Sequence, residues 1–249
     1  MNMLTTYIAI ILLSFLSAIT TLIGAVLAMC FKKSKKGVAV GVGFSAGTMV
    51  VISSLELLPE AVKASGNVTA LGGMIMGILL IFSLNLVIPH IHYGKEKGKL
   101  PMQLKTAYLI AFGLILHDFP EGFAMANSYI HSPALGWLVA ISIAIHNIPE
   151  EFAMAIPLVL TKKKKILINL AILSGLSEPL GVIFGLLVCS IAPTLNAFFM
   201  AFAAGAMVFV SFHELLPMAR RYKQLPFFVW GVGLSVIVYF GLNLLFKTI

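Results

Sequence analysis

The stretch HDFPEGFAMA at residues 117–126 recurs as HNIPEEFAMA at residues 146–155, and the two copies agree at seven of ten positions. Residues four apart on a helix lie on one face. Each copy therefore places its histidine beside the glutamate that follows four residues later, with a further polar residue next to the histidine. The residues are His117, Asp118 and Glu121 in the first copy and His146, Asn147 and Glu150 in the second.

This combination of side chains indicates a metal site. Two imidazoles and several carboxylates form a mixed nitrogen and oxygen site that suits a first-row divalent metal such as zinc, iron or manganese. Pro120 and Pro149 each remove a helical hydrogen bond, which frees the carbonyls of Leu116 and Ile145 beside the site. Irregular backbone at membrane depth is tolerated where it lines a cavity. The alternative is that each motif is a buried His–Glu pair that only packs helices.

The composition around the motifs is that of a membrane protein. The 249 residues are 60% hydrophobic and 10% charged, with a mean hydropathy of +1.03, whereas soluble domains carry about 25% charged residues. Eight apolar runs are long enough to cross about 30 Å of hydrocarbon. We therefore predict an all-α, multi-pass membrane protein in which residues 1–249 form a single domain. The expected helices span about 7–31, 38–62, 69–89, 106–128, 134–160, 166–190, 194–219 and 226–246.

Basic residues fall in alternate loops of this arrangement. Of the 17 Lys and Arg residues, 15 lie in the first, third, fifth and seventh predicted loops, and only Lys63 and Lys247 lie on the other side. The positive-inside rule then places those loops in the cytoplasm and both termini outside. The net charge of +8 is thus a topology signal, and its distribution argues against nucleic acid as a partner.

Acidic residues follow the opposite pattern, because seven of the nine lie within predicted spans. An ionised carboxylate at the bilayer centre costs roughly 2.5–3.5 kcal/mol on insertion scales, and the predicted spans hold no Lys or Arg to pair with it. Protonation, water or a bound cation must compensate. The seven residues are Glu56, Asp118, Glu121, Glu150, Glu151, Glu178 and Glu214.

Several further residues are candidates for metal binding or for the transport path. Glu178, in SGLSEP, is a third intramembrane carboxylate before a proline, and we expect it to be a ligand that bridges to the two motifs, with a separate proton carrier as the alternative. His90 and His92 are candidates for receiving metal at a cytoplasmic exit, although a plain loop pair fits as well. His131, in a predicted outer loop, suggests no role. Candidates for lining the path or supporting the ligands, with helix packing as the alternative, are Ser53, Glu56, Glu151, Ser177, His213 and Glu214. Glu60, near the expected outer mouth, is a candidate for attracting cations, with a merely solvated residue at the helix end as the alternative.

A second echo lies elsewhere in the chain. SSLELLPEA at residues 53–61 matches SFHELLPMA at residues 211–219 at six of nine positions. Both echoes join helices of opposite predicted direction. They therefore indicate an inverted repeat, in which a site near the midplane lies at the interface of the repeats. The matches are short, so chance and shared local packing are the alternatives.

The paired HxxPE motifs on neighbouring helices, SGLSEP on the next helix, and eight spans with both termini outside resemble the ZIP (Zrt-, Irt-like) family of metal transporters over nearly the whole chain. The resemblance implies a 3+2+3 arrangement of helices and import of zinc and other divalent metals towards the cytoplasm. It implies a binuclear centre on helices 4, 5 and 6, with Glu121 and Glu150 bridging. One metal position would use His117, Glu121, His146 and Glu150, and the second Asp118, Asn147 and Glu178.

The short chain, which lacks a long histidine-rich loop, resembles the compact bacterial branch of the family, and this implies the cell (inner) membrane as its location. A homodimer is implied by the family alone. Two residues depart from the common pattern. Asp118 stands where asparagine is usual, and Glu151 stands where glycine often follows the second motif.

We therefore expect a divalent-metal transporter and not an enzyme. Zn²⁺ is the expected substrate, with Fe²⁺, Mn²⁺, Co²⁺ and Cd²⁺ as further ones, and we expect no organic cofactor and no partner beyond metal ions, the lipid bilayer and a second copy. The rivals are an intramembrane metalloenzyme and a proton or monovalent-cation carrier. The sequence holds no HExxH motif, the pattern of a metalloprotease, and the two paired histidines argue against a carrier that uses carboxylates alone.

Overall fold

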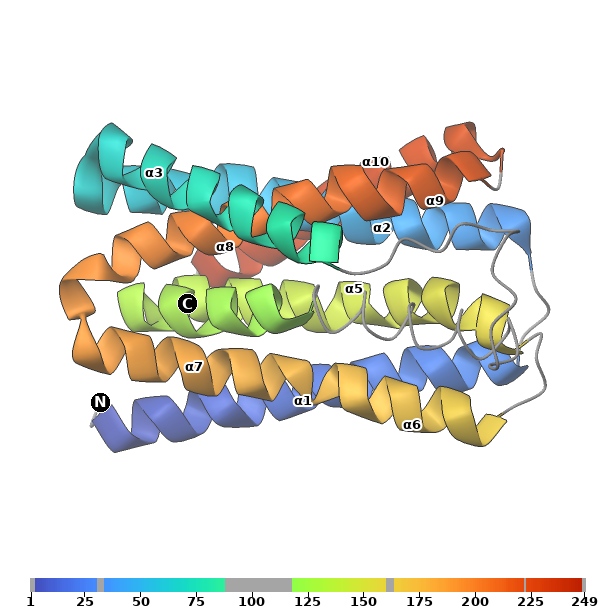
Figure 1. Cartoon of the computed structure of the whole chain (residues 1–249), viewed down its shortest axis with the longest axis horizontal. Helices are drawn as coiled ribbons and strands as arrows, with labels where there is room; N and C mark the ends of the chain where they lie inside the picture. Colours follow the sequence, from blue (N-terminus) through green and yellow to red (C-terminus); the bar gives the residue numbers. More distant parts are fainter. Residues whose placement is uncertain (1–2, 31–33, 88–117, 160–163, 222, 248–249) are drawn as a thin grey trace.

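The computed structural model describes residues 3–30, 34–87, 118–159, 164–221 and 223–247, and all of its regular elements are helices. They run side by side along the long axis of the molecule, and the two chain ends lie towards the same end of the bundle (Figure 1). By length and composition, five of them can cross a membrane. The all-α prediction is confirmed for this part of the chain. The five candidate spans are Thr5–Cys30, Lys35–Leu84, Lys165–Ile191, Pro193–Arg220 and Leu225–Phe246.

The first half of the chain forms α1 (Met3–Cys30) and one long helical stretch. In this stretch α2 (Lys35–Ile52) passes through the π-helical turn η1 (Ser53–Leu57) into α3 (Leu58–Val87). Gly66 has φ 80° and ψ 165° within α3, a region that glycine adopts readily. The chain turns back there (Figure 1), so the predicted helices 38–62 and 69–89 lie on the two sides of Gly66.

The second half begins with the helix that includes residues 118–131. The start of the predicted helix 106–128, together with His90, His92 and His117, lies outside the described residues. The predicted helix 166–190 corresponds to α6 and α7, which follow each other through Leu176 and form one candidate span, Lys165–Ile191. The elements that follow are α5 (Pro133–Val159), α6 (Lys164–Gly175), α7 (Ser177–Ile191), η2 (Pro193–Leu195), α8 (Asn196–Val210), η3 (Ser211–Leu215), α9 (Leu216–Arg221) and α10 (Leu225–Lys247).

The second sequence echo has a structural counterpart, because η1 and η3 are both π-helical turns. In each, the leucine before a proline donates its N–H to the carbonyl of the serine five residues back. The proline, Pro59 or Pro217, has no N–H, and its ring clashes with the carbonyl four residues back. One widened turn relieves this conflict. The two copies therefore share a backbone distortion as well as a sequence.

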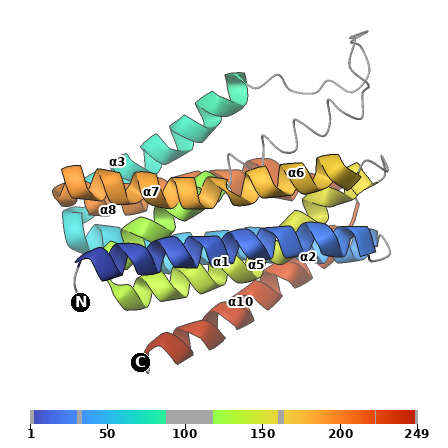
Figure 2. The ribbon, with the colours of Figure 1, turned by 90° about the horizontal axis from the view of Figure 1, so that it is seen from below.

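Helix packing repeats in the same way. A Cβ atom on Gly73 of α3 would lie 2.3 Å from the carbonyl oxygen of Phe198 in α8, and one on Gly231 of α10 would lie 2.1 Å from that of Val40 in α2. Gly231 follows Gly73 by 158 residues, and Phe198 follows Val40 by the same number. The same separation relates η3 to η1. Figure 2 shows α3 and α10 inclined on opposite flanks of the bundle. The same close contact is thus built twice.

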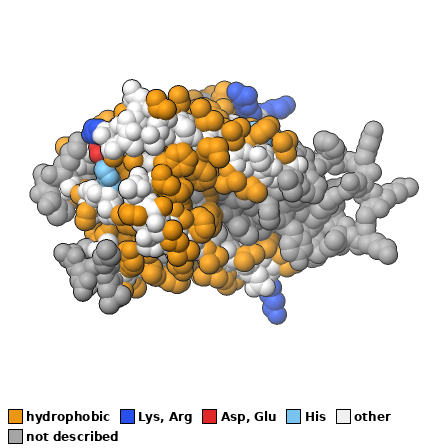
Figure 3. Space-filling view, turned by 60° about the vertical axis from the view of Figure 1, so that its left-hand side comes forward, with side chains coloured by type: hydrophobic (Ala, Val, Ile, Leu, Met, Phe, Trp, Pro, Cys, Tyr) orange, Lys and Arg blue, Asp and Glu red, His pale blue; other side chains and the backbone are white. Residues whose placement is uncertain are grey.

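The outside of the bundle is apolar. Large hydrophobic side chains are well exposed on several helices, such as Leu12 of α1 and Ile237 and Leu244 of α10, at 63–70%. In the space-filling view, hydrophobic side chains cover the middle of the face, and charged ones lie towards its margins (Figure 3). Soluble monomers rarely expose apolar surface on this scale. The described helices therefore belong to a multi-pass membrane protein.

Candidate metal centre

Two groups of buried ligand atoms meet between the helix of residues 118–131, α5 and α7. Glu121, His146 and Glu150 form the first group, and Asp118, Glu121 and Glu178 form the second. Within each group the ligand atoms all lie within 4.8 Å of one another. None of the five residues is more than 5% exposed. Glu121 belongs to both groups, so the two groups form one region. With Asn147 included, this region holds six of the seven predicted ligands. The seventh, His117, lies outside the described residues.

His146 is oriented as a ligand. Its Nδ1 lies 2.9 Å from the carbonyl oxygen of Ser142, which can only accept, so the proton is on Nδ1. The other nitrogen, Nε2, lies 3.2 Å from Oε1 of Glu121 and 3.8 Å from Oε2 of Glu150. Histidines that bind metal commonly donate their other N–H to a carbonyl or carboxylate. The ring is therefore set for a cation between these carboxylates.

The second motif is held from both sides by α1 and α2. A Cβ atom on Gly24 of α1 would lie 2.5 Å from the carbonyl oxygen of Ile148, and one on Gly41 of α2 would lie 3.0 Å from that of Pro149. Pro149 cannot donate to the carbonyl of Ile145, four residues back. The neighbouring helices therefore approach the backbone of α5 closely at Ile148 and Pro149.

The first motif makes an equally close contact with α7. A Cβ atom on Gly122 would lie 2.0 Å from the carbonyl oxygen of Glu178, and one on Gly181 would lie 2.2 Å from that of Phe119. Two helix backbones in direct contact bring short side chains together. This approach explains how Asp118 reaches Glu178 across the interface.

Glu178 lies at the junction of α6 and α7, in the first turn of α7 after Leu176, and Pro179 follows it. Pro179 has no N–H, so the carbonyl of Gly175, four residues back, receives no helical hydrogen bond from it. The helix continues through the junction, since Leu176 donates to the carbonyl of Ile172 and Leu180 to that of Leu176.

Helix α1 supplies two hydroxyl groups that the sequence analysis missed. Nδ2 of Asn147 lies 2.6 Å from Oε1 of Glu178, 3.0 Å from Oγ of Ser17 and 3.3 Å from Oγ1 of Thr21. Two N–H groups therefore serve three acceptors. The signal in the sequence is a polar stripe with helical spacing, because Ser14, Ser17 and Thr21 share one face of a mostly apolar helix.

Helix α6 contributes the matching contact on the other side. Ser174 donates a short hydrogen bond to Asp118 of the first motif. Ser17 makes the corresponding contact with the second motif, where it accepts a hydrogen bond from Asn147. Ser174 follows Ser17 by 157 residues, and the glycines of α1 and α7 that meet the two motif backbones have the same separation. The two motifs are therefore held by equivalent residues of the two repeats.

Three carboxylate oxygens near the centre are buried without a partner. Among the described residues, Oε2 of Glu121, Oε2 of Glu178 and Oε2 of Glu151 form no hydrogen bond. No described Lys or Arg forms an ion pair with these residues. Burying a carboxylate in this way is costly unless a cation compensates. The arrangement therefore suits a bound divalent metal.

Comparison with known proteins identifies the family of this chain. The model of the ZIP zinc transporter family matches residues 94–239, which include both HxxPE motifs and SGLSEP. The chain belongs to the ZIP family. Among its relatives are the zinc transporters ZupT of Escherichia coli O127:H6 and O7:K1, each 40% identical over 222 residues that cover 85% of this chain and 86% of the relative. The resemblance seen in the sequence is thus confirmed.

Three predicted path residues of this ZIP protein lie in its interior. Ser177 donates to the carbonyl of Ser174 at 2.6 Å. The hydroxyl of Ser53 is buried and has no partner among the described residues. Glu151 faces α1, where a Cβ atom on Gly24 would lie 2.9 Å from its Cβ. None of the three belongs to either ligand group.

The remaining path residues of the ZIP chain lie apart from the ligand groups. His213 is exposed and stacks on Phe209, with ring centroids 4.8 Å apart. Glu214 is half-buried in η3. Glu56 and Glu60 line a separate pocket. None of these four residues belongs to either ligand group.

One stretch of this ZIP chain matches a hydrolase pattern without its structure. GFSAG, residues 43–47, has the GxSxG spacing, but a nucleophilic serine of that kind needs a sharp turn between a strand and a helix. Ser45 lies within α2, is buried, and donates to the carbonyls of Gly41 and His146 at 3.2 Å and 3.1 Å. Its role is to join α2 to α5.

Proposed function

We propose that the protein carries zinc across the membrane into the cytoplasm through the two ligand groups that share Glu121. The observation that supports this proposal is the convergence of buried carboxylates and an imidazole among apolar helices, with carboxylate oxygens left for a cation. The relatives are named zinc transporters. One metal position would use His117, Glu121, His146 and Glu150, and the second Asp118, Asn147 and Glu178, with Glu121 and Glu150 bridging.

The ligand chemistry extends the proposal to other divalent metals. Carboxylate-rich sites with one or two imidazoles also suit iron, manganese and cobalt, because such ligands discriminate weakly by themselves. We include Fe²⁺, Mn²⁺, Co²⁺ and Cd²⁺ as further substrates. Histidines and carboxylates must be deprotonated to bind metal, so entry of the ion releases protons from the centre.

For the architecture we propose eight spans in a 3+2+3 inverted repeat, with both termini outside the inner membrane. The repeated glycine contacts support it, since α2 meets α10 as α8 meets α3, and α1 meets α5 as α7 meets the helix of residues 118–131. Movement of one repeat against the other would open the centre to each side in turn. His90 and His92 remain the proposed exit, and a homodimer remains a prediction.

Uptake into liposomes tests the function. Protein would be reconstituted with a zinc-sensitive dye inside, and zinc added outside. Wild-type protein should fill the liposomes, whereas His117→Ala, His146→Ala and Glu150→Ala should fall to the level of protein-free liposomes. Ser190→Ala is the matched control, because Ser190 is exposed on α7 and donates within its own helix to Leu187. Normal uptake by the three variants would refute the site, and no uptake of any divalent metal by wild type would refute the function.

A further inference from the structure

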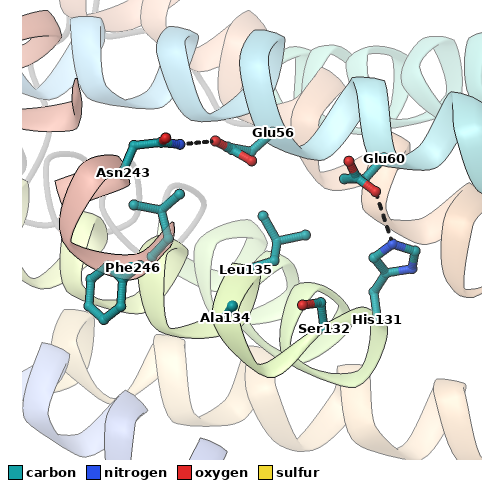
Figure 4. Close-up of a pocket in the computed structure, with 9 residues that line it drawn as sticks. Glu56, Glu60, His131, Ser132, Ala134, Leu135, Asn243 and Phe246 are labelled. Carbon is teal, nitrogen blue, oxygen red and sulfur yellow. Dashed lines mark hydrogen bonds and ion pairs between the residues drawn. The ribbon is translucent and has the colours of Figure 1, made fainter. Parts of the chain in front are cut away.

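A second polar cavity lies where the helix of residues 118–131 turns into α5. It has a volume of about 240 Å³ and is lined by residues of α3, η1, α5 and α10 as well as by this turn. Its polar residues belong to neither ligand group. In Figure 4, Glu56 and Glu60 face the cavity from one side, and Ser132 and His131 face it from the other. The polar lining consists of Glu56, Glu60, His131, Ser132 and Asn243.

The geometry of Glu60 and His131 suits a shared cation. Nε2 of His131 and Oε2 of Glu60 lie 3.3 Å apart, and both side chains are about one-quarter exposed. Bonds of about 2.0–2.2 Å to zinc, at a tetrahedral angle, place two ligand atoms roughly 3.3–3.5 Å apart. The pair could therefore bind one ion with little rearrangement.

Lys63 makes the pair a weak site. Its Nζ lies 2.6 Å from Oε1 of Glu60, and its side chain is 70% exposed. The ammonium group competes with a cation for the carboxylate, but it can move into water when a cation arrives. A site on a conduction path must bind strongly enough to collect an ion and weakly enough to release it.

Glu56 lies in the same cavity and is held in place. Tyr239 and Asn243 of α10 both donate to Oε1 of Glu56, Asn243 at 2.7 Å. These two hydrogen bonds to Oε1 hold the carboxylate in place, and Oε2 takes no part in them. Glu56 lies in η1, one helical turn from Glu60 along the chain. It is therefore placed to receive an ion that leaves the outer pair.

The internal repeat preserves only part of this cluster. At a separation of 158 residues, Glu56 and Asn243 correspond to Glu214 and Asn85, whereas Glu60 corresponds to Met218 and Tyr239 to Ile81, a buried residue. The carboxylate of Glu60 therefore has no counterpart in the other repeat. In the proposed topology the cavity lies at the outer end, and the basic loops lie at the other. Glu60 is thus specific to the side from which metal would enter.

We propose that Glu60 and His131 form a low-affinity recruiting site for a divalent cation at the outer mouth, from which Glu56 takes the ion towards the centre. Lys63 occupies Glu60 when no ion is bound. This proposal rests on the proposed function and topology for its role in uptake. The binding of metal by the pair can be tested without either.

Binding would be measured by equilibrium dialysis of Zn²⁺ against purified protein. All samples carry Glu121→Ala, which removes the residue common to both ligand groups. We expect the number of bound zinc ions to fall by one when His131→Ala or Glu60→Gln is added, and to stay the same with Ser83→Ala, an exposed serine of α3. An unchanged count in both site variants would overturn the proposal.

Transport would be measured in liposomes as a function of external zinc. Loss of even a supporting partner of a metal ligand lowers affinity by roughly 10–100-fold, so His131→Ala and Glu60→Gln should raise the half-saturating zinc concentration about tenfold and leave the maximal rate near that of wild type. Lys63→Gln should lower it. Wild-type half-saturation in all three variants would overturn the recruiting role. If wild type itself carried no zinc, the proposed function would fail, and dialysis alone would decide whether the pair binds metal.

Discussion

Asn147 donates from Nδ2 to Oε1 of Glu178 at 2.6 Å and so joins α5 to α7 between the two ligand groups. The same amide reaches α1, and the equivalent position of the first motif, Asp118, reaches α6. Five helical elements therefore meet at the residues that follow the two motif histidines, namely α1, the helix of residues 118–131, α5, α6 and α7. The ligands therefore lie where the two repeats meet. Substitutions at this junction should alter metal binding.

The hydroxyls of α1 give the first prediction. Ser17→Ala combined with Thr21→Val should release Asn147, because two of its three acceptors are lost, and should raise the half-saturating zinc concentration roughly 10-fold or more, as expected for supporting partners of a metal ligand. Thr20→Ala is the control, since Thr20 donates to the backbone of Ser17. Uptake kinetics in liposomes measure the effect. An equal response of control and double variant would show that Asn147 does not depend on α1.

The contact between Gly122 and α7 gives the second prediction. In Gly122→Ala the new Cβ would meet the carbonyl oxygen of Glu178 at 2.0 Å, and the backbones must separate. Such overpacking costs about 1–3 kcal/mol, and separation by even 1 Å would spoil the second ligand group. We expect a lower melting temperature and loss of uptake.

Gly233→Ala serves as the matched control for that substitution. A Cβ atom on Gly233 of α10 would have no atom within 4 Å, so this alanine should leave or slightly raise the melting temperature, because alanine favours a helix over glycine. Thermal unfolding of the two purified variants decides the matter. A normal melting temperature and normal uptake for Gly122→Ala would mean that the two backbones are not in contact.

Much of the centre follows from the sequence. Acidic residues and histidines inside apolar runs need a partner, and the runs offer no Lys or Arg, so the motifs and Glu178 stand out. The role of Ser17 could not be predicted in the same way. Serine and threonine in helices often bond to their own backbone, as Ser14 does to the carbonyl of Ile11. A row of hydroxyl side chains on one face of a helix therefore gives the same sequence pattern whether or not it supports a metal site.

The fold was predictable where hydrophobic periodicity determines it. The predicted ends of α5 and α10 agree with the structure to within a residue. The predicted helix 166–190 agrees with the candidate span Lys165–Ile191, which runs through α6 and α7. The recurrence of ELLP was visible, but not the π-helical turns, since these depend on how each proline is accommodated. His131 looked uninformative because its neighbour Glu60 lies 71 residues away.

Asp118 gives the third prediction, since it occupies the position in the first motif that Asn147 occupies in the second. Asp118→Asn removes one negative charge from the second ligand group and keeps the shape of the side chain. We expect the second zinc ion to bind more weakly by about tenfold, a loss of roughly 1.4 kcal/mol, while the group of Glu121, His146 and Glu150 still binds. Equilibrium dialysis at rising zinc concentration measures this. Unaltered binding of every ion would remove Asp118 from the ligands.

The neighbours Glu150 and Glu151 give the last prediction, because they are adjacent, both buried and differ in surroundings. Glu150 lies in a ligand group with His146, whereas Glu151 faces α1 with its Oε2 unpartnered among the described residues. Glu150→Gln should therefore abolish uptake, and Glu151→Gln should reduce it far less. Removing the buried charge of Glu151, whose Oε2 has no partner among the described residues, should also stabilise the metal-free protein, by about 1 kcal/mol. Thermal unfolding and uptake of the two variants, measured side by side, test both statements. If Glu151→Gln lost uptake as completely as Glu150→Gln, then Glu151 would be part of the path that the ion takes, and the centre would extend towards α1.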